Sequence, residues 1–102
     1  MLREIVNADC HFWVDERSRI QGECRVFHVN GKISVHEQYR DGKSHGEYRS
    51  YCLSGHLINH LFHQNDKIVI DFLKEPEKYP STDEEKTLFA LKYGSGQFLP
   101  EN

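Results

Sequence analysis

Gly22-Glu23-Cys24-Arg25-Val26-Phe27 returns 24 positions later as Gly46-Glu47-Tyr48-Arg49-Ser50-Tyr51. The same offset gives identical residues at the pairs Gly22/Gly46, Glu23/Glu47, Arg25/Arg49, Gly31/Gly55, His36/His60 and Lys43/Lys67. A fixed period of this length indicates one supersecondary unit that is used more than once. The repeat therefore decides the fold class.

Each copy reads as a hairpin of two strands that meet at a glycine turn. In the first copy we expect strands at 24–29 and 32–39, joined by Asn30-Gly31 as a type I′ turn, because both residues tolerate positive φ. The second copy has strands at 48–53 and 56–63 around Ser54-Gly55. Residues 40–46, with Asp41-Gly42 as a further turn signal, are expected to connect the copies.

The flanking segments complete a single domain of 102 residues. Two prolines at 76 and 80 exclude a central strand, and Ser81 or Thr82 followed by glutamates three positions later predicts the start of a helix. We expect a mainly β fold, an antiparallel hairpin-repeat meander of about six strands with a C-terminal capping helix. Its parts are a degenerate first unit at 1–21, hairpin repeats at 22–73, a proline-containing connection at 74–80, the capping helix at 81–94 and a tail at 95–102.

Period-2 alternation gives a predicted core. It assigns these residues to the buried face: Phe27, Val29, Ile33, Tyr39, Tyr51, Leu53, Leu57 and Leu61. The opposite face of the second copy, which includes Ile58 and Phe62, is too apolar to be only solvated. Phe98 and Leu99 are expected to fix the tail.

The segment from Tyr39 to Tyr51, with Gly55 in the next turn, has the spacing Y-x-x-G-x-x-x-G-x-Y and resembles the MORN-repeat family in its variant with a period near 24 residues. The resemblance implies hairpins that stack into a curved sheet, and a protein-interaction or assembly module, as in small proteins described as antitoxins. It implies no catalytic residue. The match ends at the second connection, where Asp66 takes the place of the glycine.

Composition narrows the function classes. A net charge of −3 does not favour a nucleic-acid or membrane-surface partner, and no apolar run is long enough for a membrane span or a signal peptide. We therefore expect a cytoplasmic protein without a cofactor. The odd count of three cysteines, without a CxxC pair, argues against a disulfide framework.

The residues favour protein binding as the function, because tyrosine and arginine are enriched at interface hot spots. The candidate partner-binding residues are Arg25, Arg40, Lys43, His45, Tyr48, Arg49 and Tyr51. The protein would act as an inhibitor or antitoxin-like partner through a sheet face or an edge strand, and an unpaired edge would also permit a homodimer or a self-assembling structural protein.

Three other interpretations concern chemistry. The pairs Cys52/His28 and His36/His60 would lie side by side if the hairpins stack, which would suit zinc, although no zinc-finger spacing is present. Cys52 with His56 or His28 would suit a thiol nucleophile, but packing is the simpler interpretation. The recurring Glu and Arg positions suit either a carboxylate pair for hydrolysis or a cross-strand ion ladder, and the ladder is favoured.

Overall fold

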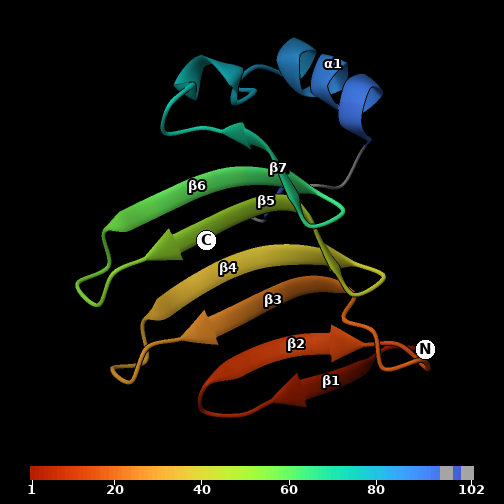
Figure 1. The fold of residues 1–102 in the computed structure, drawn as a ribbon, viewed down its shortest axis with the longest axis vertical. Helices are drawn as coiled ribbons and strands as arrows, with labels where there is room; N and C mark the ends of the chain where they lie inside the picture. Colours follow the sequence, from red (N-terminus) through yellow and green to blue (C-terminus); the bar gives the residue numbers. More distant parts are fainter. Residues whose placement is uncertain (95–97, 100–102) are drawn as a thin grey trace.

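The computed structural model describes residues 1–94, 98 and 99. It is one seven-stranded antiparallel sheet in which every strand pairs with the next along the chain, followed by a helical C-terminal segment (Figure 1). The predicted hairpin meander with a C-terminal helix is confirmed. The elements are β1 (Arg3–Val6), β2 (Cys10–Val14), β3 (Gly22–Phe27), β4 (Ile33–Arg40), β5 (Lys43–Tyr51), β6 (Leu57–Gln64), β7 (Lys67–Asp71), the 3₁₀ helix η1 (Pro76–Lys78) and α1 (Asp83–Tyr93).

Two kinds of turn alternate along the repeat. Arg40 pairs with Lys43, and the intervening Asp41-Gly42 has φ values of 54° and 81°, as a two-residue turn requires. The Asp-Gly turn signal is thus confirmed, but the expected connection over 40–46 is wrong because β5 begins at Lys43. Asn65 and Asp66 form the corresponding turn before β7, with φ values of 50° and 69°.

The turns at the other end of the strands are three residues long. Gly31 N donates to His28 O at 2.9 Å, and Gly55 N donates to Cys52 O at 2.9 Å. Gly31 has a φ of 82°, whereas Asn30 is not among the residues with positive φ. The predicted type I′ turn is therefore wrong, because Asn30 lies at the centre of an i→i+3 turn and only the glycine takes the left-handed conformation.

The predicted buried face is wrong. None of its eight members is fully buried, and Val29, Leu53 and Leu57 expose 100%, 54% and 40% of their surface. Val29 and Leu53 lie in the three-residue turns rather than in the strands. The core instead uses the other face of the second copy, as its apolar residues indicated, because the C-terminal segment covers that face.

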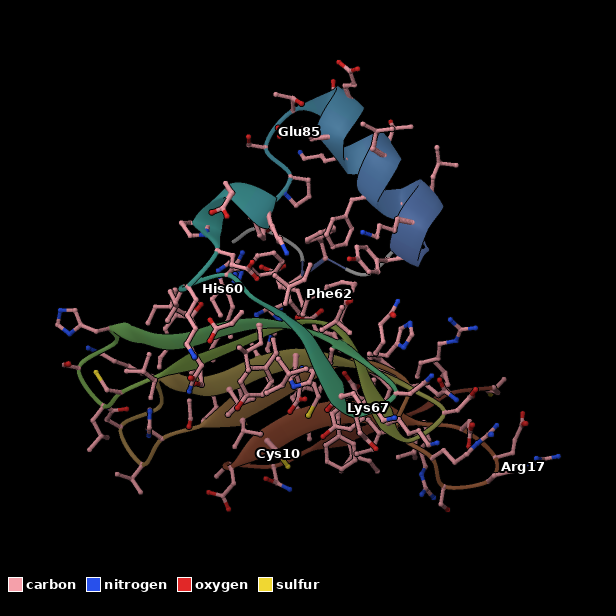
Figure 2. The ribbon with its side chains drawn as sticks, turned by 45° about the horizontal axis from the view of Figure 1, so that its top comes forward. Cys10, Arg17, His60, Phe62, Lys67 and Glu85 are labelled. Carbon is pink, nitrogen blue, oxygen red and sulfur yellow. The ribbon has the colours of Figure 1, made fainter. Side chains whose placement is uncertain are left out.

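This core lies between β6, β7 and the C-terminal segment. Phe62, Ile70, Phe72 and Phe89 are its buried members, and the rings of Phe62 and Phe89 meet edge to face with centroids 4.9 Å apart. The labelled His60 and Phe62 lie on the side of the sheet that faces the helices (Figure 2). Tyr79, Tyr93 and Phe98 pack around the cluster.

Helix α1 lies beyond β7, at one end of the sheet (Figure 1). Thr82 is its N-cap and forms the predicted capping box with Glu85. Of the apolar residues in the helix only Phe89 is buried, whereas Leu88 and Leu91 expose 59% and 80% of their surface. No helix within residues 1–94 is long and apolar enough to span a membrane.

Candidate functional site

One row of side chains crosses the sheet from β2 to β6. His11 pairs with Arg25, Arg25 with His36, His36 with Arg49, and Arg49 with His60. Residues directly opposite each other in neighbouring strands share a face. Histidine and arginine therefore alternate along one face, which we call the His–Arg row.

Glutamates join this row into two equivalent triads. In the first, His36 Nε2 lies 2.6 Å and Arg25 Nη2 lies 2.5 Å from Glu23 Oε1. In the second, one repeat later, Glu47 Oε2 lies 2.6 Å from both His60 Nε2 and Arg49 Nη2. The expected ion ladder is therefore present in altered form, because each Glu–Arg pair lies along one strand and each Glu–His pair crosses to the neighbouring strand.

The C-terminal segment covers the second triad. Leu99 N donates to Glu47 Oε1 at 2.8 Å, and Arg49 Nη2 donates to the Tyr79 hydroxyl at 3.3 Å. The His60 ring lies 5.1 Å from the Tyr79 ring between centroids. Leu99 is buried, so the expectation that it fixes the tail is confirmed; residues 95–97 and 100–102 of the predicted tail lie outside the described part of the chain.

Burial, together with the hydrogen bonds and charges that offset it, sets the charge state of the second triad. Glu47 has no exposed surface. Burial alone would raise the pKa of Glu47, but hydrogen bonds from His60 and Leu99 and the charge of Arg49 outweigh it and lower the pKa below its ordinary value. Burial, followed by the negative charge of Glu47, raises the pKa of Tyr79. The covered triad thus contains an ionised Glu47 carboxylate. The neutral hydroxyl of Tyr79 lies beside the triad and can both donate and accept a hydrogen bond.

The first triad is open. The side chains of Glu23 and Arg25 expose 29% and 31% of their surface. With His11 and Trp13 of β2 they line a hollow of about 20 Å³, which is close to the space that one water molecule needs. Arg25 Nε is buried without a hydrogen-bond partner among the described residues. This half of the face therefore has polar groups whose bonding is incomplete.

The hollow has an aromatic and acidic border. The rings of His11 and Trp13 lie 5.9 Å apart between centroids. His11 Nε2 lies 2.7 Å from Glu4 Oε2 on β1. An aromatic wall beside an Arg–Glu pair combines the apolar area and hydrogen-bonding groups that protein interfaces use.

The seven candidate partner-binding residues do not form one patch. Arg25 lies in the open triad and Arg49 in the covered one. Tyr48 lies on the opposite face from its neighbour Arg49, with its ring against that of His63 at 5.2 Å. The others lie toward the ends of β4 and β5.

These four are placed as follows. Arg40 and Lys43 flank the Asp41-Gly42 turn and are exposed. His45 is half-buried, and both of its ring nitrogens lack a partner among the described residues; burial, and then the charge of Arg40, lower its pKa. Tyr51 ends β5, where its carbonyl accepts from His28 Nε2 at 2.8 Å.

The pairs Cys52/His28 and His36/His60, considered above as zinc ligands, do not form a site within the described part of the chain. His36 and His60 are not side by side, because one repeat spans two strands and Arg49 lies between them in the row. His28 is instead hydrogen-bonded to a main-chain carbonyl. Within residues 1–94, 98 and 99, no group of three or more His, Cys, Asp or Glu side chains could hold a metal ion.

The thiol interpretation has a local basis in the turn after β5. Cys52 Sγ lies 3.0 Å from Ser54 Oγ, which lies 2.9 Å from His56 Nδ1. The Ser54 hydrogen bond, together with the His56 main-chain amide, lowers the pKa of Cys52 to about 6. This turn can present a thiolate near neutral pH, although no carboxylate joins the cluster among the contacts of the described residues.

Sequence reasoning identified Arg25, and Glu23 as its ladder partner, but not His11 and Trp13 beside them. The repeat marked Glu23 and His36 as recurrent, and the period of two strands would have placed both beside Arg25. Trp13, the only tryptophan of the chain, had no repeat partner to mark it. Comparisons of this chain with models of protein families, with curated proteins and with solved structures found no match.

Proposed function

We propose that the protein is a non-catalytic protein-binding module, and that the open triad with Trp13 and His11 is its binding surface. The observation that carries the proposal is the contrast between the two triads. The same Glu–Arg–His arrangement occurs twice, and within the described residues the C-terminal segment contacts only the second copy. The resemblance of residues 39–51 to MORN repeats supports the same class of function.

The surface has the properties of a small interface. Trp13 supplies apolar area, and Arg25 and Glu23 supply a donor and an acceptor that are each only partly exposed. Side chains of this kind dominate binding energy when a partner removes them from water. The binding of such a protein to a functional surface of its partner would make it an inhibitor or an antitoxin-like protein.

The test is a quantitative co-purification with the tagged protein in cells that express it naturally. We expect one partner to be recovered with the wild type and lost with Trp13→Ala and with Arg25→Ala. Arg17→Ala, which removes an exposed arginine from the turn after β2, is the matched control and should retain the partner. Retention by all three variants would show that the open triad is not the binding surface.

Edge pairing remains a second prediction for the same function class. Strands β1 and β7 form the two edges of the sheet, and either edge would permit a homodimer. Sedimentation at increasing protein concentration would distinguish this arrangement from a monomer that binds another protein.

A further inference from the structure

The two triads present the same groups at equivalent repeat positions. Glu23 and Glu47 each accept from an arginine two residues later and from a histidine on the next strand. What binds the covered triad therefore indicates what the open triad can bind. This step rests on the proposed function, since it describes the partner of that surface.

The cover on the second triad consists of two polar contacts and an aromatic surface. A main-chain amide, Leu99 N, donates to the carboxylate, and a tyrosine hydroxyl accepts from the guanidinium. The rings of Phe72 and Tyr79 lie 4.9 and 5.1 Å from the His60 ring between centroids. None of these covering groups is charged, because Glu47 and Arg49 already neutralise each other.

Within the described part of the chain, the open triad has no counterparts of these contacts. Among the described residues no group donates to Glu23 Oε2, whereas Glu47 uses both of its oxygens. No tyrosine hydroxyl within the described part of the chain lies on Arg25, whereas Arg49 Nη2 donates to the Tyr79 hydroxyl at 3.3 Å. Trp13 beside the pair supplies an aromatic wall. His36 is already buried, with only 3% of its side chain exposed, so a ligand would contact Glu23 and Arg25 rather than this ring.

We infer that the open triad binds an extended segment of a partner protein, which donates a main-chain amide to Glu23 and places a tyrosine hydroxyl on Arg25. A small anion does not fit, because Glu23 already neutralises Arg25 and a second negative charge would be repelled. A neutral peptide segment completes both hydrogen bonds without burying a new charge. A second copy of the chain is disfavoured, because its own Tyr79 and Leu99 already cover its second triad.

The experiment selects random linear peptides, displayed on phage, against the full-length protein. Peptides that bind are then measured by isothermal titration on the wild type, Arg25→Ala, Glu23→Ala and the control Arg17→Ala. We expect the selected peptides to share a tyrosine, and a Tyr→Phe change in the peptide to weaken binding roughly fivefold to tenfold, as the loss of one hydrogen bond predicts. Replacement of one peptide amide by an ester should weaken binding roughly tenfold or more, since that amide donates to a carboxylate.

Double-mutant cycles that combine a protein substitution with a peptide change show which protein group contacts which peptide group. The Tyr→Phe change should have no further effect on Arg25→Ala, and the ester should have no further effect on Glu23→Ala. Peptides that lose affinity on Arg25→Ala, but whose affinity is unchanged by Tyr→Phe and by every ester, would overturn this inference. The open triad would still be supported as the binding surface. Peptides that bind all variants equally, or a selection that enriches none, would overturn the inference, and the co-purification result would then judge the surface separately.

Discussion

The main-chain amide of Leu99 donates a hydrogen bond to Glu47 Oε1 at 2.8 Å, across 52 positions of the chain. This contact joins the C-terminal segment to the middle of the sheet, beside the Gln38 side chain that donates to Phe98 O at 3.0 Å. Glu47 is fully buried, and its remaining bonds go to Arg49 and His60. A single carboxylate therefore holds together β5, β6 and the segment that covers them.

Glu47→Gln should destabilise the protein by about 3 kcal/mol near neutral pH, because it leaves Arg49 without a buried counter-charge and replaces the carboxylate that His60 and Leu99 N contact. The folded-state pKa of Glu47 is lowered, so its contribution is present above the ordinary glutamate pKa of 4.5 and is lost as the pH falls through the lowered value. The difference in unfolding free energy between variant and wild type should therefore become smaller in acid. Urea unfolding near pH 7 and near pH 3 measures both effects.

Glu23→Gln is the matched control for this prediction, since Glu23 occupies the same repeat position but is 29% exposed. Its effect should stay within about 1 kcal/mol, as is usual for exposed ion pairs. Equal losses of unfolding free energy in the two variants would mean that the C-terminal cover does not make the second triad contribute more to stability than the first.

Glu37→Gln should have the opposite pH dependence. Burial raises the pKa of Glu37, and hydrogen bonds from Ser44 and Tyr39 only partly offset it. A raised folded-state pKa gives stability that is complete below the unfolded value near 4.5 and is lost as the pH rises through the folded value. Glutamine keeps an acceptor for the Ser44 hydroxyl at 2.9 Å without the buried charge.

We therefore expect the change in unfolding free energy on Glu37→Gln to be about 1 kcal/mol more favourable near pH 7 than near pH 4. Urea midpoints of wild type and variant at the two pH values test this. If the variant lost the same stability at both pH values, folding would not raise the pKa of Glu37; a larger loss near pH 7 would show that the fold stabilises the carboxylate as an anion. Either result would contradict this prediction.

Phe62→Ala should cost about 3–5 kcal/mol, because Phe62 has no exposed surface and its ring meets those of Phe89 and Tyr93. Leu91→Ala in α1 is the control, since 80% of Leu91 is exposed and its loss should stay within about 0.5 kcal/mol. Thermal or urea unfolding of the two variants compares them directly. Similar losses would mean that α1 packs through Leu91 as well.

The parts of the fold that local signals determine were predictable from the sequence. The 24-residue period gave the hairpins, and the Thr82–Glu85 capping box gave the start of α1. The buried face was predictable only in part. The apolar residues of the second copy, Phe62 among them, indicated that its other face is not simply solvated, but the choice of the core face depends on where Phe98 and Leu99 dock from far along the chain.

The triads were predictable only in part. The recurrence of Glu23 and Arg25 indicated a cross-strand ion ladder, whereas in the structure this pair lies along β3 and Glu23 contacts His36 across the strands. The partners across the strands depend on register, which shifts at irregularities such as the one between Ser50 and Tyr51. Period-2 counting loses the correct face at such a shift. The equivalent positions His36 and His60 were expected to lie side by side, but one repeat spans two strands, so Arg49 lies between them and each histidine contacts a glutamate instead.

Cys52 should be alkylated by iodoacetamide with a rate that rises with pH and levels off above a midpoint near 6. The cause is the hydrogen bond from Ser54 followed by the main-chain amide of His56, which together lower the pKa of the thiol to about 6 and so favour the reactive thiolate. Cys24 is the internal control, because burial raises its pKa to about 11 and its side chain is inaccessible. Mass spectrometry of the labelled peptides reports each cysteine separately.

Ser54→Ala should move the Cys52 midpoint upward, toward the ordinary thiol value of 9.0, because it removes the largest stabilising contact of the thiolate. The turn itself should persist, since Gly55 N still donates to Cys52 O and Cys52 N to His56 O. A wild-type midpoint already near 9, unchanged in Ser54→Ala, would show that the serine does not stabilise the thiolate. A low midpoint that survives Ser54→Ala but rises in His56→Ala would assign the effect to the histidine side chain, which lies 3.9 Å from the sulfur.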